Sequence, residues 1–355
     1  MNNKPILSSK GHIVVVTLYK PYFGGTPTVM ENLLHGFSPD SFSIATYSTN
    51  YTSTHEDENG ITLYRFFKKI RFSYRINKIY KNLFINQNSK RLINFCKAQN
   101  SVAIIGVYPD IHLFKCAFDA AEHLGIPFIP YLHDTIIEGL NGKEASLIKK
   151  ATFIHKKMLD ICPNILVISA GLKKLYQQKY NKLVHVIEHT YPESKIEGER
   201  IKEVISKKSI FWGGTVGRFN DAIVQRASIA AKILGHNFEI TGVRSINALK
   251  FYGISTENIQ LCSYPLREDY LNALRLQGIL LLGINWPDES PIQYDELSTI
   301  FPTKSIEYLL SGVPILVHCP IDYFLSDFFV QNKCGLVVND RDIASLVEAI
   351  KIFPI

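Results

Sequence analysis

The 355-residue sequence has no run of 18 consecutive apolar residues, although 46% of its residues are apolar. We therefore expect no transmembrane helix. Residues 1–20 hold only a short apolar run and no small-residue cleavage site, so we also expect no signal peptide. The six cysteines are scattered and form no CxxC pair, which argues against a disulfide framework or a zinc site. These absences predict a reduced, cytoplasmic protein without a bound metal.

Acidic residues are absent between Glu58 and Asp110, and the same window holds ten lysines and arginines. The whole chain carries a formal charge of +7, so the remainder, with 29 bases and 32 acids, is slightly acidic. The basicity is therefore one local patch. A patch favours an anionic surface or substrate, whereas a uniformly basic chain would favour nucleic acid. No aromatic–basic RNA motif is visible, and we expect no nucleic-acid partner.

Part of this window reads as a basic amphipathic helix. One arc of the helical wheel carries four cationic side chains, namely Arg71, Arg75, Lys78 and Lys81. The opposite arc is apolar. Two interpretations stay open: an ordinary surface helix with its apolar side in the core, or a helix that docks on anionic lipid headgroups or an anionic acceptor.

Short β-branched runs alternate with helical stretches along the whole chain, which predicts βαβ units and parallel sheets. The alternation stops in the charged segment 191–208 and restarts at residue 209. We therefore predict an α/β protein with an N-terminal Rossmann-like domain over 1–190, a linker over 191–208 and a C-terminal Rossmann-like domain over 209–355. Ligands of such sheets bind outside the carboxyl ends of the strands, so a cleft between the domains is the expected site.

A glycine pair follows the first predicted strand of each domain: Gly24-Gly25 and Gly213-Gly214. Neither belongs to a GxGxxG fingerprint. Paired glycines let backbone N–H groups approach an anion, and Arg218, just after the second pair, has the forked guanidinium that suits phosphate oxygens. The alternative is a tight strand-to-helix turn with a surface arginine.

His133 lies at the carboxyl end of a predicted strand over 127–134. An imidazole at that position would face a cleft and donate a hydrogen bond to a sugar hydroxyl or a phosphate. The alternative is a structural histidine whose neighbour Asp134 orients it.

The most specific segment is FPTKSIEYLLSGVPIL at 301–316. Lys304 and Glu307 share one face at the start of a predicted helix, because they are three residues apart. A lysine beside helix N-terminal amides suits a diphosphate, and a carboxylate one turn on suits ribose hydroxyls. The alternative is an i,i+3 salt bridge on a solvated helix.

This segment resembles the donor-binding signature of the GT-B-fold glycosyltransferases of group 1, the family 4-like enzymes. Its Pro302-Thr303-Lys304, Glu307-Tyr308 and Gly312-Val313-Pro314 match every element of that pattern. The two glycine pairs and His133 fall in the expected order, so the resemblance covers nearly the whole chain. It implies two Rossmann-like domains that face a central cleft, with a nucleotide-diphosphate sugar held by the C-terminal domain.

The resemblance also implies roles for single residues. Lys304 and Arg218 would hold the diphosphate, Glu307 the ribose, and His133 the transferring sugar as the catalytic histidine. The full set of implied donor-binding residues is Gly24, Gly25, Gly214, Arg218, Gly242, Tyr264, Leu266, Thr303, Lys304, Ser305 and Glu307.

The sequence departs from the family at two places. Thr299 stands where a second glutamate is usual, with Asp295 and Glu296 as the nearest carboxylates. Ile223 and Val224 stand where a lysine is usual. These departures concern the recognition of the sugar.

The function that the resemblance implies is a metal-independent, retaining glycosyltransferase that needs no cofactor. It would move a sugar from a nucleotide-diphosphate sugar to a glycan or lipid-diphosphate-linked acceptor, in the synthesis of a bacterial surface polysaccharide at the inner face of the cell membrane. Cationic side chains and helix dipoles would stabilise the departing diphosphate. Two alternatives stay open: a nucleotide-sugar 2-epimerase on the same fold, and a non-catalytic nucleotide-sugar-binding relative.

Overall fold

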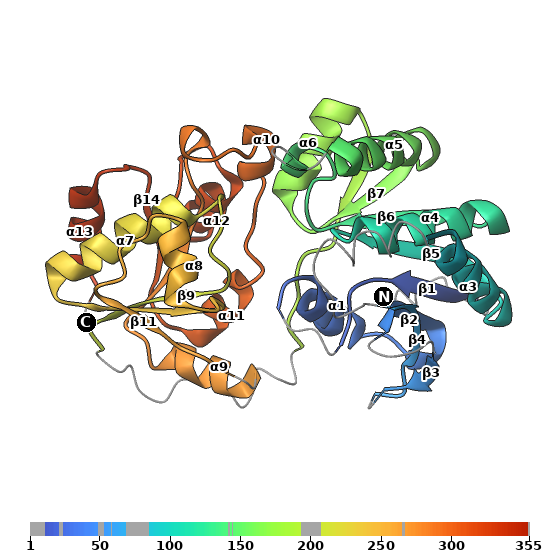
Figure 1. The fold of residues 1–355 in the computed structure, drawn as a ribbon, viewed down its shortest axis with the longest axis horizontal. Helices are drawn as coiled ribbons and strands as arrows, with labels where there is room; N and C mark the ends of the chain where they lie inside the picture. Colours follow the sequence, from blue (N-terminus) through green and yellow to red (C-terminus); the bar gives the residue numbers. More distant parts are fainter. Residues whose placement is uncertain are drawn as a thin grey trace, which may run out of the picture. The chain divides into compact units, whose positions relative to one another are not determined.

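The computed structural model describes residues 11–20, 24–48, 53–57, 59–68, 85–140, 143, 145–192, 207–264 and 267–353. They divide into two compact units, each with its own sheet (Figure 1). Unit 1 holds the described residues up to Ile137 and from 145 to Thr190, and unit 2 holds the rest. Residues 138–140 and 143, which the sequence places in the first domain, thus belong to unit 2. Some predicted features lie outside the described residues: Arg71, Arg75, Lys78, Lys81, Leu266 and most of the linker.

Unit 1 contains an eight-stranded sheet with the order β3-β4-β2-β1-β5-β6-β7-β8. Its strands are β1 (His12–Val16), β2 (Phe42–Ser48), β3 (Ser53–Glu56), β4 (Thr62–Lys68), β5 (Ser101–Tyr108), β6 (Phe128–Leu132), β7 (Asn164–Val167) and β8 (Leu183–Val186). Its helices are α1 (Thr26–Leu34), η1 (Pro39–Ser41), α3 (Ile85–Ala98), α4 (Ile111–Leu124), α5 (Ala145–Ile161) and α6 (Ala170–Tyr180). All strand pairs are parallel except β3–β4.

The strand order explains how the helices cover this sheet. From β4 through α3, α4, α5 and α6 the chain advances in one direction across the sheet, whereas α1 leads from β1 back to β2. Right-handed crossovers therefore place α3 to α6 on one face and α1 on the other. The direction reverses between β1 and β5, and such a reversal marks the usual binding edge of an open α/β sheet.

Unit 2 contains a six-stranded parallel sheet with the order β11-β10-β9-β12-β13-β14. Its strands are β9 (Ser209–Gly213), β10 (Asn237–Thr241), β11 (Ile259–Leu261), β12 (Ile279–Gly283), β13 (Ile315–His318) and β14 (Leu336–Val338). Its helices are η2 (Glu138–Leu140), α7 (Asp221–Leu234), α8 (Ile246–Phe251), α9 (Arg267–Arg275), η4 (Pro287–Glu289), α10 (Tyr294–Leu297), α11 (Ser305–Ser311), α12 (Phe324–Asn332) and α13 (Ile343–Lys351).

Three segments meet at the carboxyl edge of this sheet. The turns after β9 and β10 lie there because these neighbouring strands run parallel. The start of α11 lies there as well, since α11 returns through a short turn to the beginning of β13. The strand order reverses between β9 and β12, so this edge is again a topological switch point.

The predicted alternation of strands and helices is confirmed in both units. Helix α6 begins directly after Ser169, whose hydroxyl caps it by accepting a hydrogen bond from the Leu172 amide at 3.2 Å. The antiparallel strand β3 escapes sequence reasoning because its residues are mostly polar and exposed. No helix in the described ranges is both long enough and apolar enough to cross a bilayer.

Candidate functional site

Lys304 and Trp212 form the centre of the candidate site in unit 2. The Lys304 Nζ lies 3.3 Å from the centroid of the Trp212 ring, and Trp212 is 1% exposed. Within the described part of the chain, the contacts of this ammonium are two aromatic rings, the second being Tyr308 at 5.8 Å. Burial lowers the pKa of Lys304 well below its ordinary value. Lys304 as a whole is half-buried, and its ammonium lacks a carboxylate partner among the described residues, so an anion that arrived here would be bound favourably.

Gly213 connects this lysine cluster to the end of β9. Its amide donates a hydrogen bond to the Tyr308 hydroxyl at 2.8 Å. A Cβ at this position would lie 3.0 Å from the Tyr308 Oη and would also clash with the Tyr270 Oη. The predicted donor-binding residue Tyr264 is half-buried and its ring lies 6.1 Å from that of Tyr270. A side chain at 213 would therefore force the two tyrosine hydroxyls to shift.

Gly214 and Gly242 bring two turns into backbone contact. Their φ angles are +124° and +82°, a region that favours glycine. A Cβ on Gly242 would lie 2.7 Å from the carbonyl carbon of Gly214, and the Gly214 amide donates to the Thr241 carbonyl at 3.0 Å. The two predicted glycines thus meet and leave one part of the carboxyl edge without side chains.

Arg218 lies in the same turn but has other contacts in the structure. Its Nη1 lies 3.5 Å from the Asp221 carboxylate, and its guanidinium lies 5.4 Å and 5.9 Å from the rings of Tyr252 and Phe251. The side chain is 54% exposed. Its predicted contact with a diphosphate stays a prediction.

The first turn of α11 holds the other predicted donor-binding residues. Glu307 and Ser305 are buried, and Thr303 is half-buried. The Ser305 hydroxyl has no hydrogen-bond partner among the described residues. No ion pair joins Lys304 to Glu307. The alternative of a solvated i,i+3 salt bridge is therefore wrong, because Lys304 turns toward Trp212 instead.

Thr299, which departs from the family pattern, has a local structural role. Its hydroxyl donates to the carbonyls of Asp295 and Glu296, at 3.1 Å and 3.0 Å. The threonine therefore closes the short helix α10. Glu296 itself is buried, and a Cβ on Gly139 would lie 3.3 Å from its carboxyl carbon.

Unit 1 brings its predicted residues together around His133. The Gly24-Gly25 pair precedes α1, with φ angles of +81° and +55° and open space where side chains would lie. The first residue of α1 is Thr26, whose hydroxyl is hydrogen-bonded to the His133 Nδ1 at 3.2 Å. The glycine turn, the start of α1 and the histidine after β6 thus form one cluster at the carboxyl edge of this sheet.

The imidazole of His133 is held neutral. It is 8% exposed, and burial, with a smaller effect of the nearby His189, lowers its pKa to about 3. Its Nε2 has no hydrogen-bond partner among the described residues. Because Thr26 occupies the other ring nitrogen, Nε2 is the atom that a ligand would meet.

Sequence reasoning assigned no role to Trp212 and Thr26, which are central to the two clusters. Each lies directly beside a glycine pair, and that adjacency is the only signal that the sequence offers for them. Trp212 is a buried strand residue by pattern, and its contact with a lysine 92 positions away depends on the fold.

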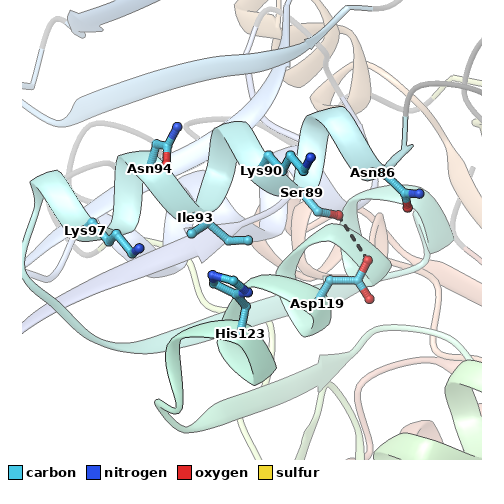
Figure 2. Close-up of a pocket in the computed structure, with 8 residues that line it drawn as sticks. All are labelled: Asn86, Ser89, Lys90, Ile93, Asn94, Lys97, Asp119 and His123. Atoms are coloured by element: carbon cyan, nitrogen blue, oxygen red, sulfur yellow. Dashed lines mark hydrogen bonds between the residues drawn. The ribbon is translucent and has the colours of Figure 1, made fainter.

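A separate groove lies between α3 and α4 in unit 1 (Figure 2). Its volume is about 460 Å³, and its lining residues are Asn86, Ser89, Lys90, Ile93, Asn94, Lys97, Asp119 and His123. The Asp119 carboxylate accepts hydrogen bonds from Ser89 at 3.0 Å and from Lys115 at 2.7 Å. The groove contains none of the predicted site residues. In the described residues, no group of three or more histidines, cysteines or carboxylates could hold a metal ion.

Comparison with solved structures identifies the fold. Sucrose-phosphate synthase from Thermosynechococcus elongatus superposes with a TM-score of 0.64 at 12% identity, over 96% of this chain and 89% of that one. HepE from Anabaena, solved in complex with UDP, gives 0.62 at 10% identity, over 96% and 89%. A glycosyltransferase from Rickettsia africae gives 0.56 at 14% identity, over 97% and 88%.

The chain therefore has the GT-B fold of these proteins over nearly its whole length, which confirms the predicted fold class. No family model and no curated protein sequence matches the chain.

Proposed function

We propose that this protein is a glycosyltransferase whose unit 2 binds a nucleotide-diphosphate sugar. The observation that carries the proposal is the half-buried Lys304, whose ammonium lies on the Trp212 ring at the carboxyl edge of the sheet, without a carboxylate partner among the described residues. An anion is the partner that such a lysine needs, and a topological switch point is where ligands of this fold class bind. The GT-B fold of the chain supports the same function.

UDP is the first nucleotide to test, because the HepE structure of the same fold contains UDP. The space where a Gly214 side chain would lie is open, which leaves room for a close approach by the nucleotide. Tyr264, half-buried beside Tyr270, is proposed to contact the base, and Glu307 to contact the ribose. Thr303 and Ser305 would contribute to the phosphate end at the start of α11.

The chemistry proposed for the diphosphate is electrostatic. Lys304 would move from the Trp212 ring to the phosphate oxygens, and Arg218, whose side chain is half exposed, would leave Asp221 for the same ligand. Positive charge placed where negative charge develops lowers the barrier to departure of the nucleoside diphosphate. The proposal needs no metal ion and no cofactor.

His133 is proposed to contact the transferring sugar in unit 1. Its imidazole is neutral at neutral pH and Thr26 holds its orientation, so Nε2 can hydrogen-bond to a sugar hydroxyl without introducing charge. The Gly24-Gly25 turn would face the phosphate and the acceptor. The proposal has three further parts, which the sequence resemblance to group 1 GT-B glycosyltransferases supports. The transfer retains the anomeric configuration, the acceptor is a glycan or a lipid-diphosphate-linked molecule, and the product belongs to a bacterial surface polysaccharide.

The decisive experiment measures thermal stabilisation by UDP, GDP and CMP and by their sugars, in the wild type and in Lys304→Ala and Glu307→Ala. A ligand that binds only the folded state raises the melting temperature. We expect one nucleotide class to stabilise the wild type and both variants to lose that shift and the turnover of the donor while they remain folded. Wild-type shifts in both variants would refute the site.

The control variant is Lys351→Ala, which removes a surface lysine paired with Glu348 at the end of α13 and should keep the full shift. Incubation with UDP-N-acetylglucosamine in the absence of acceptor identifies a 2-epimerase, which would convert this donor alone. A non-catalytic relative would bind a donor in calorimetry and transfer its sugar to no acceptor, whereas a transferase would transfer it once the acceptor is present.

A further inference from the structure

Phe153 is an exposed aromatic side chain surrounded by lysines. It lies in the middle of the 17-residue helix α5 and is 58% exposed. On a helix, the residues three and four positions away in either direction are the nearest neighbours of a side chain. Around Phe153 all four of these positions are lysines, namely Lys149, Lys150, Lys156 and Lys157. A single apolar residue therefore stands at the centre of a cationic ring.

The four lysines differ in their partners. Lys157 is paired with Glu122 of α4 at 3.3 Å, and its ammonium also lies 5.5 Å from the Phe153 ring. The Lys150 Nζ lies 3.0 Å from the His112 Nδ1. Lys149 and Lys156 are exposed, and no carboxylate among the described residues pairs with them. The outer surface of α5 therefore retains unneutralised positive charge on either side of Phe153.

The neighbouring helices extend this charge over one face of unit 1. The layer of α3, α4, α5 and α6 contains eleven lysines and arginines against three carboxylates. Lys90 and Lys97 of this layer flank the groove between α3 and α4 (Figure 2). A charge excess of this kind attracts an anionic surface at long range.

We propose that the outer surface of α5 docks on an anionic lipid bilayer. Phe153 would enter the boundary between headgroups and acyl chains, while Lys149 and Lys156 would contact lipid phosphates. A nucleic acid or an anionic glycan would satisfy the lysines but offers no apolar layer for Phe153 to enter. A bilayer combines negative charge at its surface with an apolar layer directly beneath, so it matches both parts of this surface.

This surface is independent of the basic segment that carries Arg71 and Arg75, which lies outside the described residues. It is also independent of the proposed sugar-transfer chemistry. The test is co-sedimentation of the full chain with vesicles of phosphatidylglycerol mixed with phosphatidylcholine, and with vesicles of phosphatidylcholine alone. We expect binding to the anionic vesicles, weakened by salt, and much weaker binding to the neutral ones.

The variants distinguish the two parts of the surface. Phe153→Ser and the double variant Lys149→Ser/Lys156→Ser should each weaken vesicle binding on the order of tenfold. Phe153→Leu, which remains apolar, should bind like the wild type. Phe37→Ser is the matched control, because Phe37 is 57% exposed and follows α1, on the other face of the sheet. All these side chains are exposed, so the variants should fold.

Four results would overturn the proposal. The first is failure of the wild type to bind anionic vesicles at all, and the second is binding of Phe153→Ser and the double lysine variant at the wild-type level. The third is a pair of observations: both Phe153→Leu and Phe153→Ser lose vesicle binding, and the protein binds heparin only when Phe153 is present. Together they would indicate that Phe153 is an aromatic platform for an anionic glycan. If replacement of Arg71, Arg75 and Lys78 alone abolishes vesicle binding, α5 is not the docking surface.

Discussion

The hydroxyl of Thr26 and the Nδ1 of His133 lie 3.2 Å apart, although 107 residues separate them in the sequence. This contact joins the first residue of α1 to the end of β6 and orients the imidazole. Because burial lowers the pKa of His133 to about 3, the ring is neutral, and the threonine determines which nitrogen remains for a ligand. An orienting residue of this kind affects catalysis through the group that it holds.

We therefore predict that Thr26→Val lowers the turnover rate with a nucleotide sugar by about fivefold to tenfold, the value of one lost hydrogen bond. Valine has the shape of threonine and removes only the hydroxyl. Affinity for UDP, which lacks the transferring sugar, should stay at the wild-type value, because the Lys304 cluster belongs to unit 2. Steady-state kinetics with varied donor and calorimetry with UDP measure the two quantities. Thr26→Ser should restore the rate, and a variant whose loss appears only in KM would contradict the role.

Donor binding should be accompanied by proton uptake at Lys304. Burial against the Trp212 ring lowers the pKa of this lysine, whereas a bound diphosphate would raise it. The complex would therefore hold more protons than the free protein, and affinity for UDP would fall as the pH rises through the lowered pKa. Titration calorimetry in two buffers of different ionisation enthalpy measures the uptake directly.

Lys304→Arg is the informative control for this proton uptake. Arginine stays charged at every accessible pH, so the variant should bind UDP without a proton exchanged at this position. Identical proton uptake in Lys304→Arg and in the wild type would assign the titrating group elsewhere.

Sequence reasoning placed the glycine pairs and His133 after predicted strands, and it placed Lys304 and Glu307 at the start of a predicted helix. The structure has these residues at those places, while their binding roles stay predictions. The structure brings Gly214 to Gly242 as such a pattern requires. The carboxyl-edge location follows from parallel strands joined by helices, which the alternation in the sequence predicts.

Contacts made by long side chains could not be predicted in the same way. Lys304 has Glu307 one turn away on its own helix, yet it lies over Trp212, which precedes it by 92 residues. Arg218 is close in sequence to the glycine turn and still rests on Tyr252 and Asp221. In both cases the packing between helices and strands determines which side chain the lysine or arginine contacts. A local sequence pattern carries no information about that packing.

Gly242→Ala should destabilise the carboxyl edge of the unit 2 sheet, where the nucleotide is proposed to bind, more than an ordinary glycine substitution does. The φ of +82° costs about 1–2 kcal/mol for an L-residue, and the new Cβ would in addition lie 2.7 Å from the Gly214 carbonyl carbon. We expect a lower melting temperature and loss of stabilisation by nucleotide. Gly235→Ala supplies the control, since Gly235 has a φ of +67° with open space around the added Cβ. Equal effects of the two substitutions would contradict the close approach.

His318 should make the stability of unit 2 depend on pH. This imidazole is fully buried at the end of β13, where its Nε2 accepts a hydrogen bond from the Arg226 Nε at 3.1 Å and its Nδ1 donates to the Val338 carbonyl at 3.0 Å. Arg226 is itself fixed by two hydrogen bonds to Glu289, at 2.6 Å and 3.1 Å. A proton on Nε2 would remove the hydrogen bond from Arg226 and would place the imidazolium cation beside the Arg226 guanidinium. Burial, together with this nearby cation, lowers the pKa of His318 to about 4.

Between the ordinary histidine value near 6.5 and this lowered pKa, the unfolded chain binds a proton that the folded chain does not. The free energy of unfolding therefore falls as the pH is lowered through this window, by at most about 1.4 kcal/mol per pH unit for one such group. Urea unfolding followed at pH 7, 6 and 5 measures the slope. His318→Gln is less stable at pH 7, but its slope should be smaller than that of the wild type, because one titrating group is gone. His133, whose pKa is also lowered, keeps part of the slope in the variant. A slope in His318→Gln as steep as in the wild type would show that the buried imidazole does not bind the proton on unfolding.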